Sequence, residues 1–350
     1  MDVLRCPENP IIKPKDVRPS RNDFEIIGVF NAGVARFNDE VILLLRVAER
    51  PINDNDSIVL TALYNTNEKD IVIKEFSKDN FEIDFSDPRL ITTNEQIYLT
   101  SISHLRLARS TDGINFQIDE IPTINPENEF ETFGLEDPRI TFIDGVYYIH
   151  YVSVCEAGVT TSLISTADFN TYKRHGAIFC PDNKDVAIFA GKINGKYYAL
   201  HRPSTFLSRK QRIWLAESSD LINWGNHRPL ISPGFGSWDN CKIGAGSVPF
   251  ETDKGWLEIY HGVDSGNRYS LGAVLLDKHQ PWKVISRTDE PILQPQTNYE
   301  CEGFFGNVVF SCGLLCENNK LKIYYGAADT NICYAELSID YVFKKLKSLD

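Results

Sequence analysis

The feature that most constrains the fold of this chain is a tight turn that recurs before alternating apolar runs. Asn38-Asp39, Asp144-Gly145 and Asn194-Gly195 each precede a run rich in β-branched and aromatic residues. Asn-Gly and Asp-Gly pairs suit the tight turns of β-hairpins, and alternating runs are typical of half-buried strands. Further turns of this form are Asn94-Glu95, Lys254-Gly255 and Asn318-Asn319. The pattern predicts hairpins whose starts are about 50 to 65 residues apart.

Two further repeats have a compatible spacing. A small polar turn precedes an aromatic residue in the segments that begin at Ser110, Ser165 and Ser218. The tripeptide Asp-Pro-Arg occurs at Asp87–Arg89 and, 50 positions later, at Asp137–Arg139. One unit of about four strands fits between copies, so we expect the chain to consist of repeated four-stranded units.

Four-stranded sheets repeated at this period, with no sustained helical periodicity, are typical of an all-β β-propeller. The hairpins are compatible with six blades, or with five if the first and last strands pair in one composite blade that closes the ring. Closure removes exposed sheet edges, which favour aggregation. A β-sandwich is the structural alternative, but it does not account for the regular spacing. No linker divides the sequence, so we expect one domain over residues 1–350.

Charge and composition exclude several classes of partner. The 36 basic and 48 acidic residues give a formal net charge of −12, which disfavours nucleic acids and anionic membranes. No stretch approaches the roughly 18 apolar residues of a membrane helix, and the first residues lack the apolar core of a secretory signal, so we expect a cytoplasmic protein. The eight cysteines and seven histidines lack the spacings of disulfide scaffolds or zinc sites, so we expect reduced thiols and no metal. Nothing in the sequence identifies an oligomeric state, and a homo-oligomer stays open.

Motifs for nucleotide cofactors and for serine hydrolases do not occur in the sequence. It contains neither a P-loop nor a strand followed by a dinucleotide-binding glycine motif. It also contains no Gly-x-Ser-x-Gly elbow. We therefore expect neither a nucleotide cofactor nor serine hydrolase chemistry.

Adjacent carboxylates form the strongest local candidate for a catalytic group. The innermost strands of a propeller line a central channel, so polar residues at their ends converge although they are distant in sequence. In the segment Phe133–Arg139, Glu136 and Asp137 precede a proline that fixes the backbone, and Arg139 could orient or neutralise one of them. A carboxylate held in this way is suited to general acid catalysis. The alternative is that one carboxylate caps a turn and pairs with Arg139.

Four cationic side chains lie at or near the ends of different predicted strands. Lys242 lies in Asn240–Gly246, whose glycines permit close approach of the backbone, and His261 ends the next strand. Arg202 and Arg46 end two other runs. Each is a weak signal alone, because strand-end arginines are usually solvated or salt-bridged. Together, in an acidic protein, they predict a local anion pocket.

Several segments together resemble glycoside hydrolase family 130. They are Asn31-Ala32-Gly33, Leu45-Arg46-Val47, Gly134–Arg139, Lys242-Ile243-Gly244, Tyr260-His261-Gly262 and Tyr325–Thr330. The resemblance spans nearly the whole chain, in order. It implies a five-bladed β-propeller, rather than six blades, that acts on β-mannosides. It also implies that inorganic phosphate is the nucleophile, as in most members, and gives α-mannose 1-phosphate with inversion.

The resemblance also implies roles for individual residues. Asp137 resembles the general acid, which would protonate the leaving oxygen through the 3-hydroxyl of the bound mannose. Arg202, Lys242 and His261 resemble the phosphate ligands, although Arg209 and Arg212 lie close enough to Arg202 in sequence to be the ligand instead. The residues expected at the sugar are Asn31, Arg46, Asp329, Asp264 and Glu136.

This set of residues fits phosphorolysis on chemical grounds. An inverting glycosidase needs an acid and a separate carboxylate base that activates water. Phosphate is itself a nucleophile, so one acid and a cationic pocket suffice. We therefore expect a reversible β-mannoside phosphorylase, with inorganic phosphate as cosubstrate and no metal or organic cofactor.

Two alternatives stay open. A β-mannosidase of the same fold would need carboxylates that activate water, and Glu300 and Glu302 are the candidates. A non-catalytic propeller would bind a sugar or a protein through its channel. Among phosphorylases, the segment Asp16–Ser20 leading into Phe30–Gly33 resembles members that act on β-1,2-linked mannose, so we expect that linkage rather than β-1,4.

Overall fold

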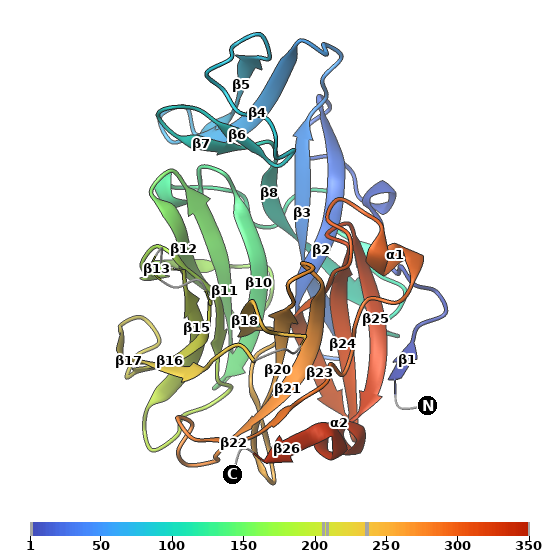
Figure 1. Cartoon of the computed structure of the whole chain (residues 1–350), viewed down its shortest axis with the longest axis vertical. Helices are drawn as coiled ribbons and strands as arrows, with labels where there is room; N and C mark the ends of the chain where they lie inside the picture. Colours follow the sequence, from blue (N-terminus) through green and yellow to red (C-terminus); the bar gives the residue numbers. More distant parts are fainter. Residues whose placement is uncertain (1–2, 205–206, 208–209, 235–237, 349–350) are drawn as a thin grey trace.

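The computed structural model describes residues 3–204, 207, 210–234 and 238–348 (Figure 1). In this part of the chain most regular structure is β-strand, arranged as five sheets around a central axis with two smaller sheets beside the ring. Each of the five sheets is one blade. The expected five-bladed β-propeller is therefore confirmed.

The first three blades each contain four antiparallel strands. The first contains β2 (Phe24–Phe37), β3 (Glu40–Pro51), β8 (Ile102–Ser110) and β9 (Gln117–Ile118). The second contains β10 (Leu135–Ile143), β11 (Val146–Cys155), β12 (Gly158–Thr166) and β13 (Lys173–Phe179). The third contains β14 (Asn183–Ile188), β15 (Tyr197–Pro203), β16 (Ile213–Ser218) and β17 (Trp224–Ile231).

The last two blades include strands from the ends of the described chain. The fourth contains β18 (Lys242–Ala245), β19 (Phe250–Thr252), β20 (Gly255–Val263), β21 (Tyr269–Leu276), β22 (Val284–Thr288) and β26 (Leu346–Ser348). The fifth contains β23 (Val309–Glu317), β24 (Lys320–Ala327), β25 (Asn331–Ser338) and β1 (Val3–Arg5). The helical segments are α1 (Asn298–Cys301), α2 (Ile339–Lys345) and the 3₁₀ turns η1 (Pro14–Asp16) and η2 (Glu129–Glu131). Among the described residues, no helix has the length and apolar character needed to cross a membrane.

The ring closes because β1 completes the last blade. It pairs antiparallel with β25, with Val3 opposite Leu337 and Arg5 opposite Ala335. This pairing gives the composite blade that the five-blade alternative requires. It also covers the outer edge of β25, which would otherwise offer unpaired backbone groups to another chain.

Five of the six predicted hairpin turns join the innermost strand of a blade to its second strand. At four of them, Asn38, Asp144, Asn194 and Asn318 have left-handed backbone, with φ between 50° and 52°. Asn and Asp adopt this conformation at less cost than most residues. The turn at Asn94 is the exception, because it lies in an insertion rather than in a blade.

The insertion lies between β3 and β8 and forms the two smaller sheets, at one end of the molecule in Figure 1. Its strands are β4 (Ile58–Asn65), β5 (Asp70–Ser77), β6 (Leu90–Thr92) and β7 (Ile97–Leu99). Phe76 and Tyr98 pack with Phe133 and Val152 of the neighbouring blade region. Asp87–Arg89 lies in this insertion, whereas Asp137–Arg139 lies in β10, so the expected Asp-Pro-Arg repeat does not mark equivalent positions.

One buried apolar cluster lies between each pair of neighbouring blades. Successive side chains of a strand point to opposite faces, and a blade has a neighbour on each face, so both faces are apolar. This explains continuous apolar runs such as residues 41–45. Burial of each large side chain stabilises the fold by roughly 1.5 to 3 kcal/mol. Residues that represent the clusters are Leu44 and Ile149, Leu163 and Ile188, Leu200 and Val274, Ile259 and Ile323, and Val34 and Tyr324.

Candidate active site

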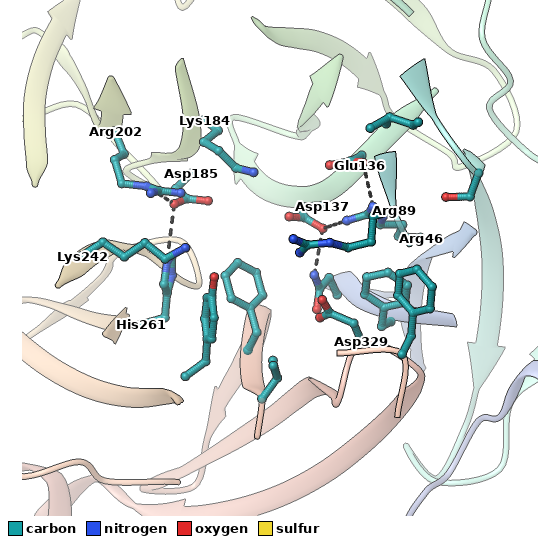
Figure 2. Close-up of a pocket in the computed structure, with 18 of the residues that line it drawn as sticks. Arg46, Arg89, Glu136, Asp137, Lys184, Asp185, Arg202, Lys242, His261 and Asp329 are labelled. Carbon is teal, nitrogen blue, oxygen red and sulfur yellow. Dashed lines mark hydrogen bonds and ion pairs between the residues drawn. The ribbon is translucent and has the colours of Figure 1, made fainter. Parts of the chain in front are cut away.

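A pocket of about 290 Å³ lies near the centre of the ring, and every blade contributes to its lining (Figure 2). Its polar lining has two parts. The carboxylate half consists of Asn31, Arg46, Glu136, Asp137 and Asp329. The cationic half consists of Lys184, Asp185, Arg202, Lys242 and His261.

β-Bulges in the innermost strands bring polar residues to this pocket. The pairing register shifts in β2 between Phe30 and Gly33, in β10 between Glu136 and Arg139, and in β14 between Lys184 and Ala187. Asn31, Asp137 and Asp185 lie within these bulges and have left-handed backbone, with φ of 51°, 48° and 52°. A bulge bends its strand and re-aims a side chain. Three blades therefore present a polar side chain to the pocket by the same local device.

Asp137 is held by two donors in the carboxylate half. Arg46 Nη1 lies 3.0 Å from Asp137 Oδ1, and Asn31 Nδ2 donates to the same oxygen at 2.9 Å. Arg46 Nη2 also donates to Glu136 Oε1 at 2.7 Å. The Arg46 guanidinium lies 4.6 Å from the centre of the Phe30 ring, which adds a cation–π contact. One arginine therefore orients both carboxylates.

The pKa values of Asp137 and Asp329 are displaced in opposite directions. Burial would raise the pKa of Asp137, but the Arg46 and Lys184 cations and the hydrogen bond from Asn31 outweigh it and lower that pKa. Burial raises the pKa of Asp329 to about 6, and the negative charges of Asp137 and Glu136 add to this effect, against the attraction of Arg46. Of these two carboxyl groups, Asp329 is therefore the one that is more readily protonated in the free pocket.

Asp185 organises the cationic half. Arg202 Nε donates to Asp185 Oδ2 at 2.6 Å, and His261 Nε2 lies 3.4 Å from the same oxygen. Figure 2 shows these two contacts on either side of the Asp185 carboxylate. A Cβ atom at position 244 would clash with Asp185 and with the His261 ring, so this approach requires glycine there. Lys242 Nζ lies 4.8 Å from the centre of the Tyr269 ring.

Burial and mutual repulsion make the cationic half receptive to an anion. Burial and the Arg202 and Lys184 cations together lower the pKa of Lys242 to about 8, against the attraction of Asp185. Burial likewise lowers the pKa of His261 to about 3, so its imidazole is neutral at pH 7. Asp185 itself has a lowered pKa, because the positive charges of Arg202 and Arg139 outweigh its burial. The neutral His261 ring has no hydrogen-bond partner at either nitrogen among the described residues and is available as a donor.

Arg139 forms no ion pair with the side chain of Glu136 or Asp137 among the described residues, although its charge contributes to the lowered pKa of Asp137. Its guanidinium donates to the carbonyl oxygens of Gly246 at 2.6 Å and Ala245 at 2.8 Å, and it lies 3.6 Å from Asp185 Oδ1. Arg46 pairs with the two carboxylates instead. Arg139 therefore connects the second blade to the fourth beneath the pocket.

Eight of the nine site residues expected from the sequence line this pocket. They are Asn31, Arg46, Glu136, Asp137, Arg202, Lys242, His261 and Asp329. Asp264 is absent from the lining, because its Oδ1 accepts hydrogen bonds from the backbone of Gly266 and Arg268 and caps the turn before β21. Arg202 lines the pocket and Arg212 does not, while Arg209 lies outside the described residues.

The two carboxylates considered for hydrolysis are also absent from the pocket lining. Glu300 is buried and accepts hydrogen bonds from Arg5 Nε and Tyr325 Oη, each at 2.8 Å. Glu302 is exposed beyond α1. Neither is placed to activate a nucleophile in this pocket.

Sequence reasoning missed Lys184, Asp185, Arg89 and Tyr269 as lining residues. Asp185 precedes the hairpin turn of its blade, as Asn31 and Asp137 do, but by nine positions rather than seven, so the spacing alone does not identify it. Arg89 reaches the pocket from the insertion, and no repeat could place it there. Among the described residues, no group of three His, Cys, Asp or Glu side chains is arranged to hold a metal ion.

Comparisons with known proteins agree with this site. Residues 98–348 match the family model of glycoside hydrolase family 130, described as beta-1,4-mannooligosaccharide phosphorylase. The chain is 46% identical over 351 residues to beta-1,2-mannobiose phosphorylase from Listeria innocua, covering 99% of both chains. It is 43% identical to a 1,2-beta-oligomannan phosphorylase from a Thermoanaerobacter species, covering 68% of this chain and 79% of the relative.

A solved structure shows the same fold across the whole chain. The structure of the Listeria innocua enzyme in complex with beta-1,2-mannobiose superposes with a TM-score of 0.95, and 99% of each chain is covered. A structure described with family 130 hydrolases that target beta-1,2 mannosidic linkages has a TM-score of 0.74 at 22% identity, which shows the fold alone. The chain belongs to glycoside hydrolase family 130.

Proposed function

We propose that this protein catalyses the reversible phosphorolysis of β-mannosides by inorganic phosphate, with inversion, to give α-mannose 1-phosphate. The observation that carries the proposal is the division of one pocket into a carboxylate half and a cationic half. An inverting hydrolase needs a carboxylate base at the position of the nucleophile. The carboxylate found there, Asp185, is paired with Arg202 and has a lowered pKa, so it is a weak base.

Each half of the pocket has one task in this reaction. Lys184, Arg202, Lys242 and the neutral His261 bind phosphate, and Asn31, Arg46 and Asp329 bind the mannose. A phosphate oxygen forms a bond to C1 of the mannose while the bond from C1 to the leaving oxygen breaks. Asp137 supplies the proton to that oxygen, through the mannose 3-hydroxyl as the family resemblance implies.

Phosphate binding itself favours protonation of Asp137. In the free pocket, the cations Arg46 and Lys184 are the main influences that oppose burial and keep the pKa of Asp137 low. A bound phosphate partly neutralises Lys184 and adds negative charge, and both effects raise the pKa of a nearby carboxyl group. The acid is therefore charged in the free protein and becomes a better proton donor once phosphate is bound.

We also propose that the substrates carry β-1,2-linked mannose. The relatives described as beta-1,2-mannobiose and 1,2-beta-oligomannan phosphorylases are 42 to 46% identical, whereas a beta-1,4-mannooligosaccharide phosphorylase from Ruminococcus albus is 36% identical. The family model that matches residues 98–348 carries a β-1,4 description. The higher identities to the β-1,2 relatives carry the proposal of a β-1,2 linkage.

A panel of mannosides with and without phosphate tests both proposals. We expect phosphate-dependent release of α-mannose 1-phosphate from β-1,2-mannobiose, and slower release from β-1,4-mannobiose and from β-1,4-mannosylglucose. Release of free mannose without phosphate would show a β-mannosidase, and no turnover on any substrate would favour a non-catalytic propeller. Faster turnover of the β-1,4 substrates would refute the linkage alone.

We further propose that the protein acts in the cytoplasm. All eight cysteines are unpaired, including the exposed Cys180 and Cys316. Unpaired exposed thiols suit a reducing compartment. Cell fractionation tests this location, and enzyme found outside the cytoplasm would contradict it.

A further inference from the structure

The insertion supplies a wall of the pocket that the proposed reaction leaves unassigned. Phosphorolysis has three participants: phosphate, the mannose that is transferred, and the sugar that leaves. The cationic half and the carboxylate half account for the first two. The remaining polar and apolar wall consists mainly of Arg89, Leu90, Leu99 and Ser101, from the insertion and the residues just after it, together with Phe304.

Arg89 is positioned in this wall by an ion pair and a ring contact. Its Nε and Nη2 donate to the two carboxylate oxygens of Asp87 at 2.9 and 2.7 Å, and its guanidinium lies 5.1 Å from the centre of the Phe305 ring. Phe305 precedes the fifth blade, so this contact joins the insertion to the segment before that blade. The third nitrogen, Nη1, has no acceptor among the described residues and stays free for a ligand.

The charge of Arg89 acts on both halves of the pocket. Its cation is among the influences on the pKa of Asp329 in the carboxylate half and of Lys242 in the cationic half. Its side chain is 47% exposed, whereas those of Asp137 and Arg202 are 6% exposed. Arg89 therefore lies above the two buried halves, on the solvent side of the pocket.

We propose that Arg89 binds the leaving sugar, with Nη1 donating to its hydroxyl groups, and that the insertion thereby sets which β-mannosides are accepted. A fixed guanidinium beside apolar Leu90 and Leu99 suits a pyranose, which has polar edges and an apolar face. This inference rests on the proposed function and identifies the site of its second sugar. Arg89 lies before residue 98, where the family match begins, so this part of the wall lies outside the matched segment.

The test compares two substrates that share the mannose but differ in the leaving group. One is β-1,2-mannobiose, whose leaving sugar has hydroxyl groups, and the other is 4-nitrophenyl β-mannoside, whose leaving group has none. Arg89→Ala should lower kcat/KM for mannobiose by about tenfold to a hundredfold, as expected for one charge-assisted contact. It should change kcat/KM for the aryl mannoside, and KM for phosphate, by less than about threefold.

Two further variants test whether the effect depends on the placement of the Arg89 guanidinium and on this particular cation of the insertion. Asp87→Asn removes the carboxylate that fixes the guanidinium. It should therefore lower the ratio of kcat/KM for mannobiose to kcat/KM for the aryl mannoside, by a smaller factor than Arg89→Ala does. Lys78→Ala removes an exposed cation of the insertion that does not line the pocket, and it should leave the ratio unchanged.

Equal losses on both substrates in folded Arg89→Ala would assign Arg89 to the mannose or to phosphate and overturn the proposal. No loss on β-1,2-mannobiose would overturn it as well. The ratio is informative whether phosphate or water is the nucleophile, since both substrates transfer the same mannose. Turnover without phosphate would therefore refute the proposed function separately from this role of Arg89.

Discussion

Asn31 and Asp137 are separated by 106 positions in the chain, yet Asn31 Nδ2 donates a hydrogen bond to Asp137 Oδ1 at 2.9 Å. Both residues have left-handed backbone within β-bulges, in β2 of the first blade and β10 of the second. Asn and Asp tolerate this conformation better than β-branched residues do. The carboxylate proposed as the acid is therefore fixed by backbone geometry as well as by its donors.

Replacement of Asp137 tests its role as the acid. Without a proton donor the leaving oxygen departs as an alkoxide, so Asp137→Asn should lower kcat for mannobiose by about 10² to 10⁴. A substrate with a good leaving group, such as 4-nitrophenyl β-mannoside, should lose much less. Asp119→Asn, which removes a carboxylate paired with Arg109 outside the pocket, is the matched control. Near-normal mannobiose turnover by the folded Asp137 variant would refute the assignment.

The raised pKa of Asp329 predicts that this residue destabilises the folded protein near neutral pH, where its carboxyl group is charged. Its folded pKa of about 6 exceeds the ordinary value of 3.8, so its contribution to stability is complete below about pH 4 and is lost as pH rises through 6. Asp329→Asn should therefore be more stable than the wild type at pH 7.5, by about 1 to 3 kcal/mol. Urea unfolding at pH 7.5 and pH 4.5 measures this, and a difference that does not shrink at the lower pH would contradict it.

The negative charge of Asp185 should be required for stability when no phosphate is bound. Asp185→Asn leaves Arg139 and Arg202 without their buried carboxylate, a loss that typically costs about 3 to 5 kcal/mol. Phosphate can partly replace the lost charge, so it should raise the Tm of this variant more than that of the wild type. Asp239→Asn, which removes the buried partner of Arg287 outside the pocket, should be destabilised without this extra response. The same phosphate-induced shift in all three proteins would refute this role of Asp185.

Phosphate use should weaken in mild alkali. The pKa of Lys242 is lowered to about 8, so its positive charge is lost as pH rises through that value. We expect kcat/KM for phosphate to fall above pH 8, because this parameter reports the ionisation of the free protein. In Lys242→Arg the cation persists and this decline should disappear. A decline of the same midpoint in the arginine variant would assign it to another group.

The hairpin turns show what the sequence could predict. Turns that begin with Asn or Asp identified four inner hairpins, because left-handed backbone depends on the local residue type. Asn94-Glu95 resembled them, but it closes a small hairpin of the insertion. The residue types of a turn do not distinguish a hairpin in a blade from one in the insertion, so the turns alone did not give the number of blades. That number depended on the long-range pairing of β1 with β25.

The site residues were likewise only partly predictable from local sequence. Asn31, Asp137 and Ser311 each stand seven positions before their hairpin turns, at Asn38, Asp144 and Asn318, and each lies in a bulge of an innermost strand. Asp185 precedes Asn194 by nine positions, so a search at fixed spacing does not find it. Asp137 and Lys242 were predicted from their strands, whereas Lys184, Asp185 and Tyr269 lie on blade strands and were not. Arg89 was not, because its position depends on how the insertion packs.

The most direct test of phosphorolysis is the steady-state kinetics of Lys242→Ala, with phosphate and β-1,2-mannobiose varied separately. Lys242 lies against Tyr269, while Glu136 pairs with Arg46, so loss of Lys242 should leave the carboxylate half intact. The account predicts that KM for phosphate rises about tenfold to a hundredfold, while KM for the mannoside changes by less than about threefold. An unchanged KM for phosphate in the folded variant would contradict the proposed mechanism.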